Sequence, residues 1–298
     1  MAELRVRTSA KINLTLDVTG ILDNGYHAIE SVFQTVGIYD EVTVDFTPAE
    51  EMSISVSCEV PEQFASADPI PCDERNIAYK AARIFMEDNS LTGECRIHIK
   101  KGIPSQAGMG GGSTDAAAVI YCLSVLTGHE LTGEEKAALG SRLGADVPFF
   151  FAGGTAYVSG IGEKIVPAPD YSGRILVIAK GSEGVSTGEA YRRIDALENP
   201  QHPDTKGLVR ALGEAPDEAW KYFGNLFGQA IQLEEVDKLE SAMLNKGALS
   251  ATMTGSGSAV FGLFESGEEA EVCAEKLRSR GYWAEVCETV GKSFIIID

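Results

Sequence analysis

The sequence has little positive charge for its size. Lysine and arginine together number 25 against 44 aspartate and glutamate residues, which gives the 298-residue chain a net charge of −19. A surface of this sign repels the phosphates of nucleic acids and of anionic membranes, so neither is expected as a partner. Any anionic substrate must therefore be met by local positive groups.

Targeting segments and redox motifs are also missing. Residues 1–7 lack the apolar stretch of a signal peptide, no run approaches a membrane span, and the six cysteines form no Cys-x-x-Cys pair. A chain of this length does not need disulfide bonds for stability, and Cys95 and Cys122 lie in apolar surroundings typical of core residues. We therefore expect a cytoplasmic protein, either a monomer or a homodimer.

The chain does have a glycine-rich segment at residues 104–118. Glycines at 108 and 110–112 lack a Cβ, so the backbone can adopt positive φ and approach a ligand closely. Ser113, Thr114 and Asp115 are typical of a helix N-terminus, and the alanine-rich residues 116–120 begin an apolar helix. Because a helix N-terminus offers free N–H groups and the positive end of a dipole, this segment predicts a phosphate site.

Known phosphate motifs do not describe this loop. No Gly-Lys-Ser/Thr follows it, which excludes a Walker A loop, and Ser113 stands where a dinucleotide fingerprint has its third glycine. The alternative is that the glycines only allow two elements to pack closely.

Alternating apolar and polar residues predict an α+β fold in two parts. We expect an N-terminal domain at residues 1–158 and a C-terminal domain at residues 159–298, with a seam near 153–165. The expected strands are 4–7, 10–18, 29–36, 41–46, 52–57, 96–100, 175–179, 248–252, 259–264, 283–288 and 294–297. The expected helices are 76–88, 113–126, 133–143, 187–197, 205–212, 227–245 and 268–280.

A lysine and an aspartate are the candidates for chemistry. Strand alternation places Lys11 and Asn13 on one polar, solvent-facing side of a half-buried strand. Asp146 follows a glycine-alanine pair and precedes Val-Pro-Phe-Phe-Phe, so its carboxylate lies beside apolar surface and needs a partner. A lysine next to this aspartate could orient and polarise a hydroxyl for attack. Alternatively, Asp146 caps a short turn and Lys11 is exposed.

Residues 255–258, Gly-Ser-Gly-Ser, form a second glycine turn between two expected strands. The pattern favours a hairpin turn, and a second set of amides facing phosphate is the alternative.

Taken together, these segments resemble the motifs of the GHMP small-molecule kinases. The carrying residues are Lys11-x-Asn13, the loop 104–117 and Thr254-Gly-Ser-Gly257. Residues 10–14, 23–27, 143–149 and 184–187, with the triple glycine, are similar to one branch of that family. That branch acts in non-mevalonate isoprenoid synthesis, on a methylerythritol that carries a cytidine diphosphate.

The resemblance implies a two-domain GHMP kinase fold. The N-terminal half should be like domain 2 of ribosomal protein S5 and the C-terminal half ferredoxin-like, with ATP and substrate between them. It also implies transfer of the γ-phosphoryl group of ATP to the 2-hydroxyl of the methylerythritol, with Mg²⁺ accompanying the ATP. Asp146 would be the base or orienter of the hydroxyl, and Lys11 would stabilise the developing charge.

The family's binding residues carry over by position. The expected ATP contacts are Asn76, Lys101, Pro104, Ser105, Gln106, Ala107, Gly108, Met109, Gly110, Gly111, Gly112, Ser113 and Thr114. The expected substrate contacts are Asn13, Tyr26, His27, Phe33, Thr187 and Tyr191. Tyr26 and His27 match the cytidine-recognition turn, Phe33 and Tyr191 are candidates to stack on the base, and Ser113 is the candidate Mg²⁺ ligand, although the sequence does not define a metal site.

The C-terminal half departs from the family in two places. Ser258-Ala259 replaces the usual Pro-Thr, and residues 225–228, Asn-Leu-Phe-Gly, lack the usual acids. The alternatives are therefore a GHMP kinase of homoserine or mevalonate type, or a nucleotide-binding regulator without turnover. The presence of both Lys11 and Asp146 argues against the regulator.

Overall fold

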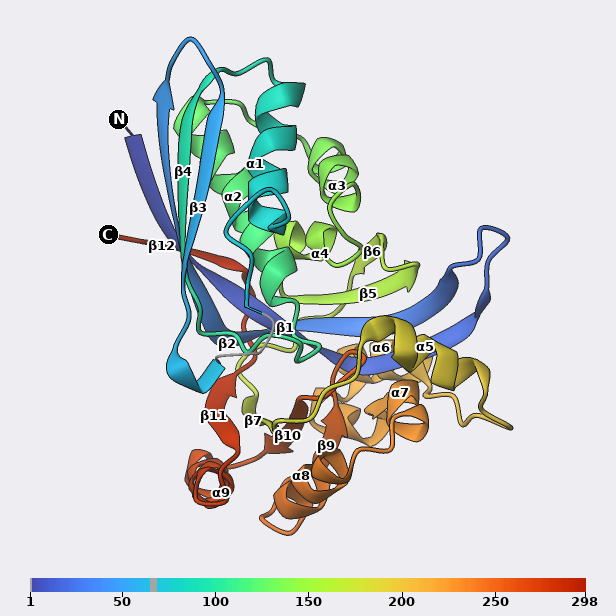
Figure 1. Ribbon diagram of the computed structural model, residues 1–298. Helices are drawn as coiled ribbons and strands as arrows, with labels where there is room; N and C mark the ends of the chain where they lie inside the picture. Colours follow the sequence, from blue (N-terminus) through green and yellow to red (C-terminus); the bar gives the residue numbers. More distant parts are fainter. Residues whose placement is uncertain (1, 65–68) are drawn as a thin grey trace.

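A long, twisted β-hairpin forms the centre of the molecule (Figure 1). The computed structural model describes residues 2–64 and 69–298. The hairpin strands belong to a sheet with the path β12-β1-β2-β4-β3, onto which β5, β6 and β8 also pair. The strands of this sheet are β1 (Ala2–Ile21), β2 (His27–Pro48), β3 (Ser53–Glu59), β4 (Gly93–Lys100), β5 (Thr155–Gly160), β6 (Lys164–Pro167), β8 (Gly224–Asn225) and β12 (Phe294–Ile297).

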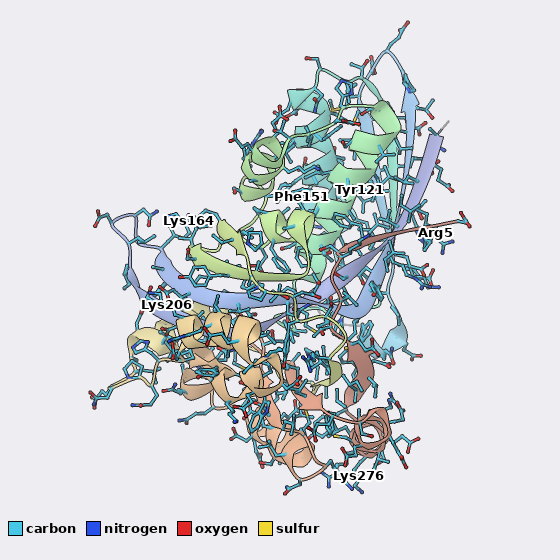
Figure 2. All side chains as sticks on the ribbon, turned by 180° about the vertical axis from the view of Figure 1, so that it is seen from behind. Arg5, Tyr121, Phe151, Lys164, Lys206 and Lys276 are labelled. Carbon is cyan, nitrogen blue, oxygen red and sulfur yellow. The ribbon has the colours of Figure 1, made fainter. Side chains whose placement is uncertain are left out.

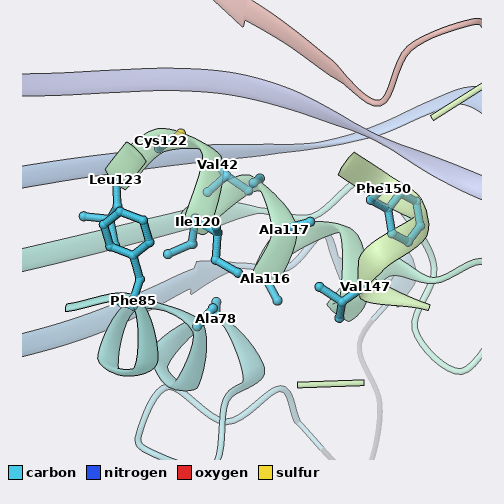
Figure 3. Close-up of a cluster of buried hydrophobic side chains, with 14 of the residues drawn as sticks. Val42, Ala78, Phe85, Ala116, Ala117, Ile120, Cys122, Leu123, Val147 and Phe150 are labelled. Atoms are coloured by element: carbon cyan, nitrogen blue, oxygen red, sulfur yellow. The ribbon is translucent and has the colours of Figure 1, made fainter. Parts of the chain in front are cut away.

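Helices cover one face of this sheet and enclose the first core. They are α1 (Ile77–Asp88), α2 (Gly111–Thr127), α3 (Gly133–Ser141) and α4 (Val147–Ala152). Ala116 and Ile120 lie on the side of α2 that packs on α1, and Val147 of α4 belongs to the same buried cluster (Figure 3). This packing fixes the N-terminus of α2 between α1, α4 and the sheet.

The second sheet is antiparallel, with the order β11-β7-β10-β9. Its elements are β7 (Ile175–Lys180), α5 (Thr187–Asp195), α6 (Thr205–Glu214), α7 (Leu226–Ala230), α8 (Glu234–Leu244), β9 (Ser250–Met253), β10 (Val260–Phe264), α9 (Gly267–Arg278) and β11 (Trp283–Glu288). The expected ferredoxin-like arrangement is present, because the elements follow one another along the chain in the order β7, α8, β9, β10, α9 and β11. Helices α5 to α7 are inserted after β7. Short 3-10 helices occupy Glu62–Phe64 and Pro216–Tyr222.

Strands from the C-terminal half of the chain join the first sheet. β5 and β6 extend the first sheet to Pro167, and the chain returns to it twice, at β8 and at β12. The domain boundary at residue 158 remains a prediction, because strands from both sides of this residue pair in the same sheet. Seen from behind, Tyr121 and Phe151 lie in the N-terminal part, and Lys276 lies on the outer helix of the other part (Figure 2).

Several expected elements were wrong in extent. The strands expected at 4–7 and 10–18 are the single strand β1, which absorbs a register shift between Ser9 and Ala10 as a bulge. The helix expected at 227–245 is broken into α7 and α8, because Ile231 leaves the helical conformation at ψ 89° and Leu233 adopts extended backbone.

The expectation of a half-buried strand at residues 10–18 was also wrong. Lys11, Asn13 and Thr15, on its polar face, are no more than 3% exposed. Thr254 and Gly255 of the C-terminal part cover this strand at Asn13, as their hydrogen bonds to Asn13 show. In the part of the chain that the structure describes, none of the helices is both long enough and apolar enough to span a membrane.

Candidate active site

The glycine loop and the start of α2 form the wall of a cavity. Gly110 is the N-cap of α2 at φ 74°, a left-handed conformation that favours glycine. The N–H of Thr114 donates to the Gly110 carbonyl at 2.9 Å, the first bond of the helix ladder. The preceding amides, of Gly111, Gly112 and Ser113, have no acceptor within the helix and are available to an anion.

Nearly all the expected ATP contacts line this one cavity, which has a volume of about 450 Å³. They are Asn76, Lys101, Pro104, Ser105, Gln106, Ala107, Gly108, Met109, Gly110, Gly111, Gly112 and Ser113. The exception is Thr114, which is fully buried with its hydroxyl hydrogen-bonded to Thr8. Its N–H is also used within α2, so a contact between Thr114 and the nucleotide stays a prediction that this geometry does not favour.

Lys101 lies at this cavity in a buried cluster with two carboxylates. Its ammonium donates to the carboxylates of Asp40 and Asp115, the latter at 2.8 Å, and the side chain is 5% exposed. Burial alone would lower the pKa of Lys101, but the charges of Asp115 and Asp40 outweigh it and raise the pKa. Asp40 also accepts the N–H groups of Gly102 and Ile103, so it anchors the segment that enters the glycine loop.

Asn76 holds the opposite wall of the cavity. It is the N-cap of α1, accepting the N–H of Ala78 at 2.8 Å, and its amide donates to the Pro71 carbonyl at 2.6 Å. Its backbone position is therefore fixed on both sides.

The structure brings Lys11 and Asp146 together. The Lys11 ammonium lies 3.5 Å from Oδ2 of Asp146, with the lysine side chain 4% and the aspartate side chain 31% exposed. Asp146 is the N-cap residue of α4, but its carboxylate makes no capping hydrogen bond. The same lysine's backbone N–H donates to the Met109 carbonyl at 3.0 Å, which joins β1 directly to the glycine loop.

Asn13 links Lys11 to the third glycine motif. Its amide oxygen accepts from the Lys11 ammonium at 2.7 Å, from the Thr254 hydroxyl at 3.2 Å and from the Gly255 N–H at 3.0 Å. Its amide nitrogen donates to Ser31 at 2.9 Å. Asn13 was expected to contact the substrate, and these bonds also make it a support for Lys11.

The turn at 255–258 is a hairpin turn, as the pattern favoured, because β9 and β10 pair antiparallel on either side of it. Its backbone touches the glycine loop so closely that a Cβ on Gly108 would lie 2.3 Å from the Thr254 carbonyl oxygen. The amides of Gly255 and Gly257 are hydrogen-bonded within the protein, to Asn13 and to the Thr254 carbonyl respectively. This turn therefore supports the phosphate loop from behind.

Aromatic rings gather where the hairpin β1–β2 meets α5. The His27 ring stacks on Tyr191, with centroids 4.4 Å apart, and its Nε2 lies 2.7 Å from the carboxylate of Asp195. Burial, followed by the negative charge of Asp146, raises the pKa of Tyr191 to about 12. The Tyr191 hydroxyl therefore lies within the electrostatic influence of Asp146.

The remaining substrate candidates separate into accessible and enclosed groups. Tyr26 is 61% exposed at the hairpin, and the Thr187 hydroxyl lies 3.3 Å from that of Ser256. Phe33 is 1% exposed, packs edge-on against Phe149 and lies 4.6 Å beneath the Lys11 ammonium. Stacking of Phe33 on a base therefore stays a prediction, and the burial of its ring does not favour it.

Sequence reasoning missed four residues of this site, namely Asp40, Asp115, Asp195 and Asn225. The partners of Asp40 and Asp195 lie 61 and 168 positions away, so no local pattern marks these two residues. Asp115 was treated only as a first-turn helix residue. A signal existed for Asn225, since its segment was noted as a departure from the family.

Comparison with known proteins agrees with this geometry. Residues 76–154 match the GHMP kinases N terminal domain, and residues 206–282 match the GHMP kinases C terminal domain. A 4-diphosphocytidyl-2-C-methyl-D-erythritol kinase from Clostridium tetani is 38% identical over 281 residues, covering 93% of this chain and 96% of the relative. The protein of that name from Clostridium novyi is 35% identical, with 92% and 95% covered.

Solved structures give the same result. The crystal structure of a 4-(cytidine 5'-diphospho)-2C-methyl-D-erythritol kinase matches with a TM-score of 0.79 at 29% identity, covering 97% of this chain and all of the other. A homoserine kinase from Cytophaga hutchinsonii shares the fold, with a TM-score of 0.77 at 17% identity over 100% of this chain and 98% of the other. The chain therefore belongs to the GHMP kinases, in the family of 4-diphosphocytidyl-2-C-methyl-D-erythritol kinases.

Proposed function

We propose that this protein transfers the γ-phosphoryl group of ATP to the 2-hydroxyl of 4-diphosphocytidyl-2-C-methyl-D-erythritol. The observation that carries the proposal is the pairing of the Lys11 ammonium with Oδ2 of Asp146 at 3.5 Å. Lys11 lies on β1, and its backbone N–H is hydrogen-bonded to the glycine loop. The names of the relatives support the choice of substrate over homoserine or mevalonate.

Asp146 and Lys11 divide the work on the accepting hydroxyl. The half-buried Asp146 carboxylate accepts the hydroxyl hydrogen bond and takes its proton. An ammonium has three N–H donors, of which Asn13 and Asp146 engage two, and the third can donate to the transferring phosphoryl oxygens. Phosphoryl transfer has a loose transition state, so this positioning and charge stabilisation supply most of the catalysis.

The triphosphate lies on the exposed amides of Gly111, Gly112 and Ser113. Lys101 lies on the same wall, where the carboxylates of Asp40 and Asp115 take up two of its three N–H donors and balance its charge, so it offers ATP the remaining N–H. Among the described residues, no cluster of three or more His, Cys, Asp or Glu side chains could hold a metal ion. This suits Mg²⁺ carried by the nucleotide, with the Ser113 hydroxyl as its protein ligand, and the ion would neutralise phosphate charge.

The cytidine is recognised between the hairpin and α5. Tyr191 offers an aromatic surface, and Tyr26 and His27 bring polar and aromatic groups to the same place. Pyrimidine bases are bound in proteins by stacking and by hydrogen bonds to their edges. We also propose that Asn13 and Thr187 contact the diphosphate and sugar, with Thr187 the more exposed of the two.

The test is a substrate panel with purified protein, ATP and Mg²⁺. ADP release should require 4-diphosphocytidyl-2-C-methyl-D-erythritol, and excess CMP should compete with that substrate. Turnover of homoserine or mevalonate instead would replace the proposed substrate. ATP binding without ADP release from any of the three would leave only a nucleotide-binding role.

A further inference from the structure

Asn225 lies at the junction between the two sheets and contacts the third glycine motif. Gly224 and Asn225 form the short strand β8, which pairs in parallel with Thr15 and Leu16 of β1. The side chain is enclosed, with Asn225 9% exposed. Asn225 is therefore paired with the strand that carries Lys11 and Asn13.

Every polar atom of the Asn225 side chain is engaged. The amide nitrogen donates to the carbonyls of Met253 and Gly255, at 2.7 and 2.9 Å, and the amide oxygen caps α7 by accepting the Phe227 N–H at 3.0 Å. Only an amide can donate twice and accept once in this geometry, so aspartate or leucine could not replace it fully.

The turn that Asn225 holds is the one that orients Asn13. Thr254 is fully buried, and it both accepts the Asn13 backbone N–H at 2.9 Å and donates to the Asn13 amide oxygen. That oxygen in turn accepts the Lys11 ammonium. A continuous chain of hydrogen bonds therefore runs from Asn225 through residues 253–255 and Asn13 to Lys11.

The other end of Asn225 reaches the base-binding side. Phe227, at the start of α7, packs edge-on against Tyr191 with ring centroids 5.0 Å apart. Tyr191 carries the stacked His27 ring. The same residue thus supports both the phosphoryl-transfer pair and the aromatic surface.

We propose that Asn225 is a positioning residue, which sets the direction of the Lys11 ammonium through the 253–255 turn and Asn13. This inference rests on the proposed function, since Lys11 must act in phosphoryl transfer for its direction to matter for the rate. Hydrogen-bonded networks of this kind lose their effect as a unit when one member is removed.

Asn225→Asp separates the two contacts of the side chain. A carboxylate can still cap α7, but it has no N–H for Met253 and Gly255, and it repels their carbonyls. We expect kcat to fall by about ten- to a hundredfold, as small misplacements of reacting groups do. The KM for ATP should stay within about twofold of its original value, because Asn225 is not among the residues lining the nucleotide cavity. Asn245→Asp, an exposed change of the same chemistry at the end of α8, is the control and should leave both constants unchanged.

Thr254→Val breaks the same chain one link further on without touching α7. If both residues act through Asn13, the double variant should be no slower than the slower single variant, which is a non-additive result. This variant also carries the test should Asn225→Asp fail to fold. Multiplying effects, or wild-type kcat in a folded variant, would overturn the inference.

Labelling of Lys11 by acetic anhydride, followed by peptide mass spectrometry, gives a readout that needs no turnover. Its rate should rise severalfold in Asn225→Asp and Thr254→Val but not in Asn245→Asp, since the ammonium loses its fixed acceptor. Unchanged labelling would overturn the link from Asn225 to Lys11. If the wild-type protein has no kinase activity but the two variants are still labelled faster than it, the proposed function is contradicted and the link from Asn225 to Lys11 stands.

Discussion

The contact between the glycine loop and the third motif can be tested with a pair of matched glycine substitutions. Gly108 and Gly128 have almost the same backbone conformation, at φ 72° and 71°. They differ in their surroundings, because a Cβ on Gly128 would meet nothing within 4 Å, whereas one on Gly108 would lie 2.3 Å from the Thr254 carbonyl oxygen. Substitution by alanine therefore adds the same backbone strain at both positions and a collision at only one.

The magnitudes follow from these two contributions. An L-residue in the left-handed region costs about 1–2 kcal/mol, and Gly128→Ala should lose this amount of unfolding free energy and no activity. Ordinary contact begins at 3.4 Å, so Gly108→Ala must move the loops apart by about 1 Å. Forced repacking of this kind costs a further ~1–3 kcal/mol, which gives a total of about 2–5 kcal/mol.

The displaced turn also carries Thr254 and Gly255 away from Asn13, and a shift of about 1 Å at reacting groups can cost a hundredfold in rate. We therefore expect kcat/KM to fall by about a hundredfold in Gly108→Ala, measured by ADP release, with stability measured by urea unfolding. Equal losses of stability in the two variants, with full activity in Gly108→Ala, would show that the two loops do not meet as described.

Three further changes are informative. Asp146→Asn should lower kcat by about 10²–10⁴-fold with little change in ATP binding, as expected for loss of a general base, and calorimetry with an ATP analogue would reveal a contrary loss of affinity. Asp195→Ala frees His27 and should raise the KM for the cytidine substrate about three- to tenfold, leaving the KM for ATP unchanged; equal effects on both would contradict a role in base recognition. Burial raises the pKa of Glu240 from an ordinary value of 4.5 to about 7, so the folded state binds the extra proton and stability falls as pH rises between these values. The loss is below about 3 kcal/mol, since the side chain is partly exposed, and Glu240→Gln should remove this slope in urea unfolding while keeping the Met253 N–H bond.

Local patterns predicted those parts of the site that depend on near neighbours. Alternation placed Lys11 and Asn13 on one face, and the Lys11–Asn13 hydrogen bond confirms it. Likewise, the glycine-rich turn before a run of alanines predicted a helix N-terminus, and α2 begins at Gly111. Both results follow from backbone periodicity and the special conformations of glycine.

Burial from across the molecule could not be predicted in the same way. Phe33 looked like a free aromatic ring, but Phe149 encloses it from 116 positions further along the chain. The Asp195 carboxylate reaches His27 across 168 positions. Contacts of this range depend on how the two sheets pack, which no short sequence window records.

Strand β12 gives the chain an unusual order of assembly. It pairs with Arg5–Thr8 of β1, and Phe294 stacks on Tyr121 of α2 with centroids 5.1 Å apart. A ribosome adding ~5–20 residues per second must work for roughly 15 to 60 s before these last partners emerge. During that time the edge of the first strand is open to other chains, which makes the nascent polypeptide a client for chaperones. Once β12 has paired with β1, the two halves share one sheet and should melt in a single transition rather than in succession.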